Sequence, residues 1–276
     1  MTWLSDDVAS HLQSVATRPD FSGTRYEIVD EIARGGMGIV YEAIDRELNR
    51  HVAVKVVPAT SRGEGHLIAG LEHPGIIPIH DAGTLADGRA FYVMKLVRGA
   101  TLDAAPPTTI AEAVRLCVRI CEPVAFAHAR GVAHRDLKPS NVMIGAFGEV
   151  LVMDWGVGVA GTPGYMAPEQ HAGPAADVFS LGTMLKQMIV ATGEAIPRRL
   201  RAILAKAIAS EPADRYASAR DLADDLVRFL DGHPVVAYPE NVLDVVVRWL
   251  DRNRALIAIV AAYLIMRVLV LLFAHR

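Results

Sequence analysis

A short loop near the middle of the chain brings an acid, a base and an amide close together in sequence. It reads His134–Asn141 and contains Asp136, Lys138 and Asn141. Such a loop can place a proton acceptor, a cation and a metal ligand around one point. The apolar run that follows ends at Asp154, and carboxylate and amide oxygens are the hard ligands that Mg²⁺ prefers. These residue types suit chemistry on an anionic group.

Two features nearer the N-terminus suit the binding of phosphate. Arg34–Val40 contains Gly35, Gly36 and Gly38, and glycines let backbone N–H groups approach a phosphate closely. Taken alone, this segment could equally be a hairpin turn. Lys55 ends a later apolar run, and its alternative interpretation is a surface lysine whose stem lies along the apolar surface.

Strand and helix patterns divide the chain into two parts. Short β-rich runs separated by turns predict strands over 26–33, 38–45, 51–57, 76–83 and 90–97. Longer patterns predict helices over 111–131, 178–192, 197–210 and 218–230, with shorter candidates over 5–16 and 63–72. A small β-rich lobe followed by a larger helical lobe is an α+β fold.

Composition excludes several classes of protein. The hydrophobic fraction of 52% excludes a disordered or low-complexity chain. Lys and Arg total 28 against 31 Asp and Glu, so the net charge of −3 offers no basic surface for nucleic acid. The two cysteines, Cys117 and Cys121, cannot build a disulfide framework and suit packing inside a reduced domain.

The hydrophobic excess is concentrated near the C-terminus. Residues 255–274 contain one charge, Arg267, and are long enough as a helix to span the hydrocarbon of a bilayer. A buried or surface-lying helix is the alternative. The arginines before this segment favour a cytoplasmic location for residues 1–254. Helical spacing in the preceding segment predicts an amphipathic juxtamembrane helix that includes Val242, Val245, Val246 and Trp249.

These motifs, in this order, resemble those of the protein kinase family, and most of all the bacterial eukaryotic-like Ser/Thr kinases. Besides the segments above, the resemblance includes Asp154–Gly156, Gly161–Glu169 and Asp177–Gly182, and it covers about residues 26–230. It implies a two-lobed protein-kinase-like fold. The expected divisions are an extension over 1–24, an N-lobe over 25–97, a C-lobe over 98–232, a juxtamembrane segment over 233–254 and a transmembrane helix over 255–274.

The resemblance implies ATP and Mg²⁺ as cofactors and assigns roles in phosphoryl transfer. The glycine loop is expected to cover the ATP phosphates, with Ala33 where the family has its first glycine. Lys55 is expected to hold the α- and β-phosphates. Asp136 would accept the proton of the substrate hydroxyl, and Lys138 would neutralise the γ-phosphate. Asn141 and Asp154 would bind Mg²⁺.

The resemblance also implies an adenine site and several bracing contacts. The adenine is expected between Val40 and Ala53 on one side and Met143 on the other, with Met94 as gatekeeper and the backbone of Lys95 and Val97 at its polar edge. Ordinary core packing is the alternative for all of these. The residues expected to brace the site are Thr162 beside Asp136 and Lys138, Asp177 under the catalytic loop, and Glu169 paired with Arg215, although Asp177 and Glu169 could instead be surface charges.

Three departures from the family pattern affect these expectations. The segment after Lys55 is short, and the best partner for that lysine, Glu64, lies between two glycines, which weaken a helix. Glu72 is the other candidate, but it directly precedes His73 and Pro74, where a helix should already have ended.

The activation segment is also short, so we expect activity without a loop phosphate. Trp155 replaces the usual phenylalanine and is expected to be tolerated. A third shortened region lies between Leu181 and Pro197 and leaves the docking of substrates open.

The predicted function is a single-pass kinase of the bacterial cell membrane. It would transfer the γ-phosphate of ATP to Ser or Thr hydroxyls of protein substrates, with the lipid bilayer bound through 255–274. The anchor could also promote self-association. The alternative is a membrane-tethered pseudokinase scaffold that binds nucleotide with little catalysis. A small-molecule kinase is disfavoured, because Lys138 and the segment Gly161–Glu169 resemble machinery for protein substrates.

Overall fold

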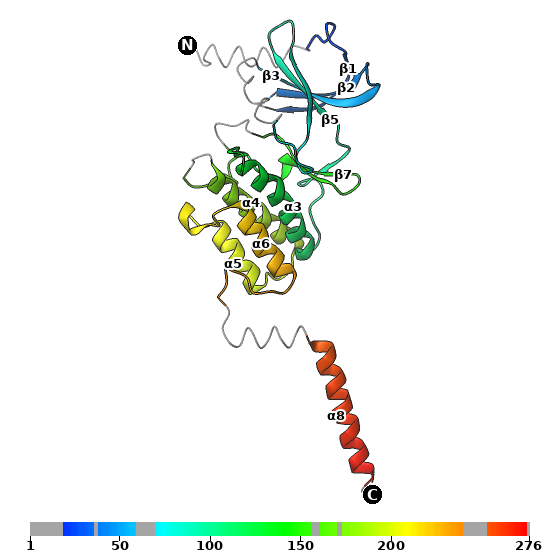
Figure 1. Ribbon diagram of the computed structural model, residues 1–276, viewed down its shortest axis with the longest axis vertical. Helices are drawn as coiled ribbons and strands as arrows, with labels where there is room; N and C mark the ends of the chain where they lie inside the picture. Colours follow the sequence, from blue (N-terminus) through cyan, green and yellow to red (C-terminus); the bar gives the residue numbers. More distant parts are fainter. Residues whose placement is uncertain are drawn as a thin grey trace.

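The computed structural model has two lobes, one built on a β-sheet and one on helices (Figure 1). It describes residues 19–35, 38–58, 70–155, 161–169, 173–239 and 253–274. The helix expected over 5–16, residues 63–69 of the helix expected over 63–72, and the amphipathic pattern of the juxtamembrane segment lie outside these residues. The described remainder, 70–72, is not helical.

The N-lobe is a five-stranded antiparallel sheet in the order β1-β2-β3-β5-β4. Its strands are β1 (Tyr26–Gly35), β2 (Gly38–Asp45), β3 (Arg50–Val57), β4 (Ile79–Thr84) and β5 (Ala90–Lys95). The register places Val40 opposite Lys55 and Ala53 opposite Met94. The residues predicted around a nucleotide are therefore brought together by strand pairing. The fourth strand begins at Ile79, whereas the apolar run in the sequence predicted a start at residue 76.

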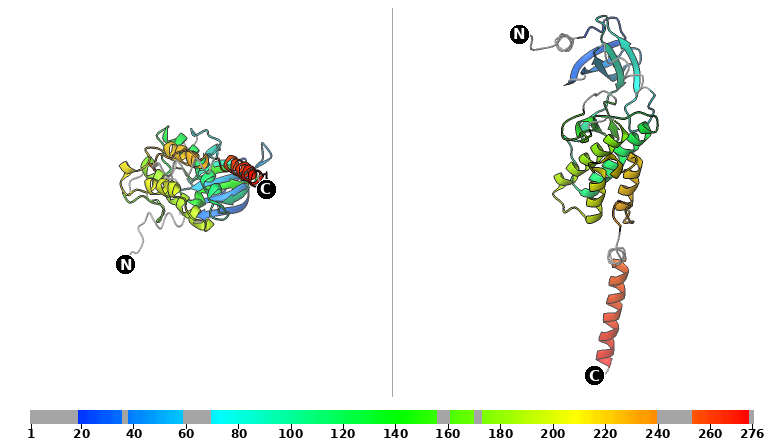
Figure 2. Two further views of the ribbon diagram at one scale, coloured as in Figure 1. Left: turned by 90° about the horizontal axis from the view of Figure 1, so that it is seen from below. Right: turned by 90° about the vertical axis from the view of Figure 1, so that its left-hand side faces the viewer.

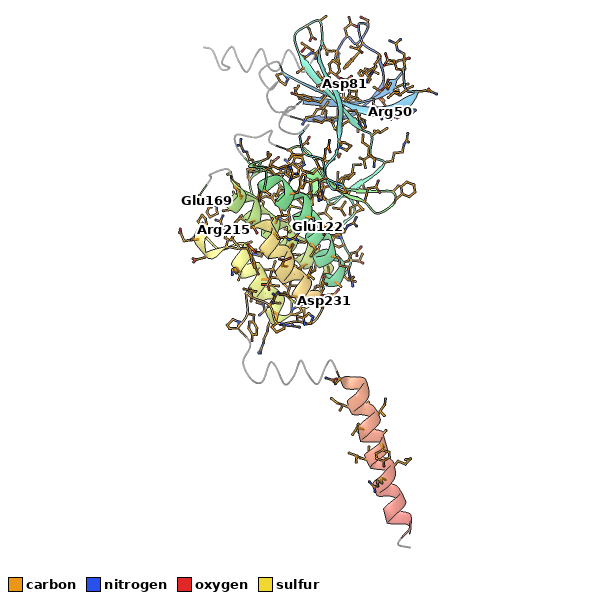
Figure 3. All side chains as sticks on the ribbon, viewed as in Figure 1. Arg50, Asp81, Glu122, Glu169, Arg215 and Asp231 are labelled. Atoms are coloured by element: carbon orange, nitrogen blue, oxygen red, sulfur yellow. The ribbon has the colours of Figure 1, made fainter. Side chains whose placement is uncertain are left out.

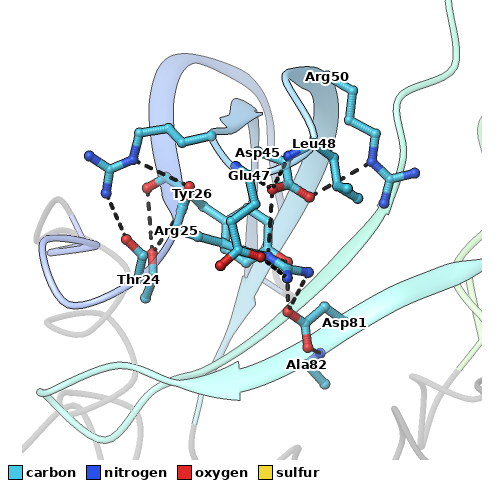
Figure 4. A network of polar contacts seen from close by, with 10 residues as sticks. Thr24, Arg25, Tyr26, Asp45, Glu47, Leu48, Arg50, Asp81 and Ala82 are labelled. Atoms are coloured by element: carbon cyan, nitrogen blue, oxygen red, sulfur yellow. Dashed lines mark hydrogen bonds and ion pairs between the residues drawn. The ribbon is translucent and has the colours of Figure 1, made fainter.

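A polar network at one end of the sheet ties β1 to β4 and to the β2–β3 turn (Figure 4). The Tyr26 hydroxyl donates to Asp81 Oδ2 at 2.6 Å, and Arg25 pairs with Glu47 at 2.8 Å and with Asp81 at 3.2 Å. The buried Asp45 carboxylate accepts the backbone N–H of Glu47 at 3.2 Å, which closes the turn. The network fixes the outer end of the sheet.

A second sheet, with three strands, was not predicted from the sequence. It contains β6 (Gly99–Thr101), β7 (Val142–Gly145) and β8 (Val150–Val152), preceded by the 3₁₀ turn η2 (Pro139–Asn141). Strands this short show no reliable periodicity in sequence. The sheet nevertheless builds the site, because β7 begins directly after Asn141 and β8 ends just before Asp154.

Among the described residues, the helical part of the C-lobe consists of four α-helices and a 3₁₀ turn (Figure 2). They are α3 (Ile110–His128), α4 (Pro174–Thr192), α5 (Arg198–Ala207), η3 (Pro212–Asp214) and α6 (Ala219–Leu230). The Thr109 side chain caps α3 by accepting the N–H of Glu112 at 3.2 Å. One large apolar core joins these helices and includes the free thiols of Cys117 and Cys121, which supports the packing role predicted for them.

The final helix, α8 (Arg254–Ala274), lies apart from both lobes (Figure 1). Its described side chains are those of 257–267, and most of them are exposed. No helix within the described part of the chain is long and apolar enough to cross a membrane.

Candidate active site

A cavity of about 400 Å³ is lined by residues from both lobes. The predicted adenine contacts from the N-lobe, Val40, Ala53 and Met94, line it together with Ala33. Met143 of β7 lines it from the C-lobe. Sequence reasoning missed several further lining residues, because their only signal was membership of an apolar run: Ile32, Val57, Ile79, Tyr92, Leu96 and Val152.

The segment joining the lobes also borders this cavity. Lys95, Leu96 and Val97 all line it. The N–H of Lys95 donates to the carbonyl of Pro78 at 3.4 Å, so this N–H is already engaged within the N-lobe. The Lys95 ammonium lies 3.7 Å from Glu149 on the turn after β7, which links β5 to the C-lobe.

Glycine is required at one position of the predicted phosphate loop for a reason internal to the fold. Gly38 has φ +130°, and a Cβ there would collide with the carbonyl of Val56 on β3. Gly35 has open space around it, which suits the approach of a ligand. Gly36 lies outside the described residues. The cavity lining includes Ala33 but neither Gly35 nor Gly38.

Lys55 pairs across the cleft with Asp154. Its Nζ lies 2.8 Å from Asp154 Oδ1, and the lysine side chain is only 10% exposed. The predicted partner, Glu64, lies outside the described residues. Glu72, the other acid near that segment, lines a different cavity from Lys55. The pair therefore connects the two lobes at the point where the triphosphate was expected.

Asp136 is the centre of a compact polar cluster. Its Oδ1 accepts the Thr162 hydroxyl at 2.6 Å and the Thr162 N–H at 3.0 Å, while Oδ2 lies 2.8 Å from the Lys138 ammonium. Lys138 also donates to the Thr162 hydroxyl oxygen at 2.7 Å. Burial by itself raises the pKa of Asp136, but the hydrogen bonds from Lys138 and Thr162 lower it below its usual range. Asp136 is therefore ionised at neutral pH and able to accept a proton.

Asn141 is oriented by Asp136 in a way that suits a metal ligand. Its Nδ2 donates to the Asp136 carbonyl at 2.8 Å and to Asp136 Oδ2 at 3.2 Å, which leaves the amide oxygen for a cation. The Asp154 carboxylate, 37% exposed, supplies a second hard oxygen. Within the described ranges, no three or more His, Cys, Asp or Glu side chains are arranged so that they alone could hold a metal ion. A donor set of one amide and one carboxylate fits Mg²⁺, which commonly takes its remaining ligands from water and phosphate.

The backbone is strained at two places in the site, in the loop that carries Asp136 and at Asp154 itself. Arg135 has φ +72° and Asp154 has φ +55°, in the left-handed region that non-glycine residues rarely adopt. Asp177 of α4, which is 1% exposed, stabilises the backbone around Arg135. Its carboxylate accepts the N–H of His134 at 2.7 Å and the N–H of Arg135 at 2.9 Å. The bracing predicted for Asp177 is present.

Two histidines complete this bracing, and the sequence singled out neither of them. His128, at the end of α3, contacts Asp177 Oδ2 at 2.7 Å through Nε2. The His134 Nε2 contacts the Met153 carbonyl at 2.7 Å, and its Nδ1 accepts the N–H of Asp136 at 3.3 Å. Burial lowers the pKa of His134, so the ring is neutral and donates from Nε2. His134 thus joins the catalytic loop to the residue before Asp154.

The predicted ion pair between Glu169 and Arg215 is also present (Figure 3). Arg215 Nη1 and Nη2 each donate to one Glu169 oxygen at 2.7 Å. The pair ties the end of 161–169, the segment that carries Thr162, to the loop before α6.

This fold and this arrangement of residues define a protein kinase. The sequence profile of the protein kinase domain matches residues 26–198, more than half of the chain, and the chain belongs to that family. The predicted two-lobed fold is therefore confirmed.

Individual relatives agree with this assignment. The chain is similar to the serine/threonine-protein kinases PknD of Chlamydia felis and Chlamydia pneumoniae, at 29% and 30% identity, over 76% of this chain and 31% of each relative. It thus spans about a third of the length of these relatives. Among solved structures, it is similar to the Mycobacterium tuberculosis PknI kinase domain, with a TM-score of 0.61, 26% identity, and coverage of 74% of this chain and 96% of that one.

Proposed function

We propose that this chain is a membrane-anchored serine/threonine protein kinase that transfers the γ-phosphate of ATP to a protein hydroxyl. One observation carries the proposal: the catalytic loop holds Asp136 and Lys138 in a closed polar cluster with Thr162, while the Lys55–Asp154 pair lines a cavity of about 400 Å³ to which both lobes contribute. Family membership and the names of the relatives support the same reaction.

The chemistry asked of these residues is mainly positioning and neutralisation of charge. Asp136 is ionised and accepts the proton of the attacking hydroxyl. Lys138 can stabilise negative charge on the transferred group, because its ammonium already lies beside the carboxylate that orients the hydroxyl. Mg²⁺, when bound by Asn141 and Asp154, supplies positive charge that neutralises the phosphates.

The Thr162 hydroxyl supports serine and threonine as acceptors. It lies between Asp136 and Lys138, within 2.7 Å of both. An incoming aliphatic hydroxyl that displaced or joined it would meet the same acceptor and the same cation. No observation favours the scaffold alternative, because each charged residue expected in catalysis is present.

The test is phosphoryl transfer from labelled ATP with Mg²⁺ by the full chain in detergent, to itself and to a generic basic protein. Asp136→Asn should reduce the transfer rate by about a hundred-fold or more while the chain still binds a non-hydrolysable ATP analogue. Lys55→Ala should weaken that binding. Arg220→Ala is the matched control, because Arg220 is an exposed residue of α6 far along the chain from the site. A parent chain with no transfer, or an Asp136→Asn variant as active as the parent, would reject the proposal.

We infer the membrane anchor from sequence and exposure. The segment 255–274 is apolar apart from Arg267. Several large apolar side chains described within it are about half exposed or more: Ile259, Val260, Tyr263, Leu264, Ile265 and Met266. An exposed apolar surface of this kind requires a non-aqueous environment or a partner. The bilayer is the partner we propose, with the kinase lobes in the cytoplasm.

A further inference from the structure

The segment that leads out of the C-lobe toward α8 is fixed to α6. The Asp225 carboxylate, 1% exposed, accepts the N–H of Val236 at 2.5 Å and the N–H of Ala237 at 3.0 Å. The Tyr216 hydroxyl donates to the same carboxylate at 2.7 Å. Because these bonds satisfy a buried carboxylate, the chain leaves the lobe from a defined place. In Figure 1 this place is the lower end of the C-lobe, opposite the N-lobe.

The first turn of α5 lies beside this exit. The Arg199 guanidinium donates to the His233 carbonyl at 2.9 Å and lies 5.8 Å from the centre of the Phe229 ring. Phe229 belongs to the last turn of α6, and His233 follows that helix. Figure 3 labels Asp231, between these two residues, at the same end of the lobe. The start of α5 and the exit therefore share one surface, here called the exit face and defined by Arg198, Arg199, Arg201, His233 and Val236.

The exit face carries arginines that are not neutralised within the described part of the chain. Arg198 and Arg201 are exposed, and Arg199 is partly exposed. None of the three forms an ion pair with a described carboxylate. Arg201, like Arg199, donates instead to a backbone carbonyl, that of Ile196 at 3.3 Å. Their positive charge is therefore available to an external anion.

Two acids close to this face do not cancel its charge. Glu194, which precedes α5, accepts the N–H of Ile110 at 3.1 Å and is thus bonded to the start of α3. Asp231 is exposed and follows the exposed Arg228 of α6, and these two residues together add no net charge. Even with Glu194 counted against them, the arginines at the start of α5 remain in excess.

The helix that carries these arginines gains nothing from them. The N-cap of α5, Pro197, has no side-chain cap bond, and the first turn of the helix contains no acid. Cations near the N-terminus of a helix oppose the helix dipole, so the arginines lower the stability of α5. A negatively charged surface outside the protein would offset that cost.

An exposed apolar side chain lies on the same face. Val236 is 65% exposed, although its N–H is held by Asp225. Arginines combined with an apolar residue fit the surface of a bilayer, where lipid phosphates lie above hydrocarbon. A free anion would neutralise the arginines but leave Val236 in water. The link to α8 also gives this face a high effective concentration at any bilayer that holds α8.

We propose that the exit face docks the C-lobe onto the anionic headgroups of the bilayer that holds α8, with its arginines on lipid phosphates and Val236 toward the hydrocarbon. This rests on the proposed function, because the membrane anchor belongs to that function. Docking at this end leaves the nucleotide cavity free, since both lobes line that cavity and the N-lobe lies at the opposite end of the molecule (Figure 1).

The test compares arginine modification in two bilayers, on the full chain in lipid nanodiscs. One disc holds phosphatidylcholine alone, and the other holds equal parts of phosphatidylcholine and the anionic phosphatidylglycerol. Reaction with phenylglyoxal, an uncharged arginine reagent, is followed by mass spectrometry of peptides. In the anionic discs Arg198 and Arg201 should react at least about five-fold more slowly, the factor for one arginine attracted to an anionic surface. Raising the salt to about 1 M should remove the difference.

Arg220 is the internal control. It is 72% exposed and lies near the start of α6. Leu230, at the end of that helix, is about 15 Å away along the helix axis, which exceeds the screening length of about 8 Å at physiological ionic strength. Arg220 should therefore react equally in the two discs. Equal rates at Arg198 and Arg201 in the two discs, or an equal slowing at Arg220, would overturn the proposal.

A double variant, Arg198→Gln with Arg201→Gln, tests the same face by removing charge from two exposed positions. Docking should weaken by about 25-fold, five-fold for each arginine. The remaining Arg199 should then react at nearly the same rate in the two discs. Arg220→Gln is the matched control and should keep the slower reaction of Arg199 in anionic discs. Slower reaction of Arg199 that survives in the double variant would count against docking through this face.

The anchor and the exit face can fail separately. If the full chain is not recovered with phosphatidylcholine discs, the anchor fails. Sedimentation of the full chain with phosphatidylglycerol vesicles then decides the exit face, because the parent should bind about 25-fold more tightly than the double variant, and equal binding or no binding would reject it. Neither measurement uses a nucleotide, so a failure of phosphoryl transfer leaves both results unchanged.

Discussion

Glu169→Gln tests the contact that ties the Thr162 segment to the helical lobe. The change keeps the size and shape of the side chain and removes its charge. Arg215 is then left with a fully buried guanidinium, 0% exposed, and without its anionic partner. Breaking a buried ion pair from one side costs about 3–5 kcal/mol.

Three backbone carbonyls also bind the Arg215 guanidinium, so the loss of unfolding free energy in Glu169→Gln should lie near the lower end of that range. Arg215 also donates to Ala209 O at 2.8 Å, Ser210 O at 2.9 Å and Ala175 O at 3.0 Å. These contacts remain in the variant and continue to stabilise the cation. The Glu169 side chain is 20% exposed, so in Glu169→Gln water can replace part of the interaction lost with Arg215. We therefore expect the free energy of unfolding to fall by about 3 kcal/mol.

The assays are urea unfolding, which gives the free energy of unfolding, and thermal unfolding, which gives the midpoint, both on the full chain in detergent and both followed by tryptophan fluorescence. A loss of this size should lower the thermal midpoint by roughly 6–12 °C for a domain of about 200 residues. Arg215→Met and the double variant complete a double-mutant cycle, in which a true pair shows a coupling energy well above the scatter of independent sites.

A loss below about 1 kcal/mol for Glu169→Gln would refute this reasoning, because that is the value of an exposed pair. Arg220→Ala serves as the surface comparison. Arg220 and Asp224 are 72% and 64% exposed and 3.9 Å apart, so breaking this contact should change stability by at most about 0.5 kcal/mol. Equal losses in the two variants would show that burial does not strengthen the Glu169–Arg215 pair.

Three further predictions concern pH, phosphorylation and the anchor. Burial lowers the pKa of His134 from 6.5 in the folded chain, so the unfolded chain binds this proton at a higher pH than the folded chain does. The free energy of unfolding should therefore fall as the pH drops below about 6.5. Unfolding measured at several pH values should show a shallower fall for His134→Gln than for the parent. Mass spectrometry of the active chain should find no phosphate on Thr162, because its hydroxyl is bonded to Asp136; a phosphate there in the active form would contradict this. Removal of 252–276 should leave a soluble protein, and recovery of that shortened chain in the membrane pellet would contradict the anchor.

Much of the site could be predicted because its motifs are local in sequence. Asp136, Lys138 and Asn141 share one loop, and a loop of that length keeps them near one another whatever the rest of the chain does. The long helices and the longer strands were also predictable, since each shows its own periodicity. The β6–β8 sheet was not, because strands of three or four residues carry too little pattern.

The contacts between distant segments were decided by the tertiary structure. Lys55 and Asp154 are 99 residues apart, and the motifs alone favoured Glu64 as the partner of that lysine. The bond of His134 to the Met153 carbonyl, 19 residues further along the chain, depends on how β8 lies against the catalytic loop.

The sequence by itself therefore determined which chemical groups the site contains, because residue type and local spacing are written in the chain. Only the tertiary structure decided which of these groups meet and how Asp154 is held. Pairing across the cleft and strain at a single φ angle depend on the packing of segments that the sequence separates widely.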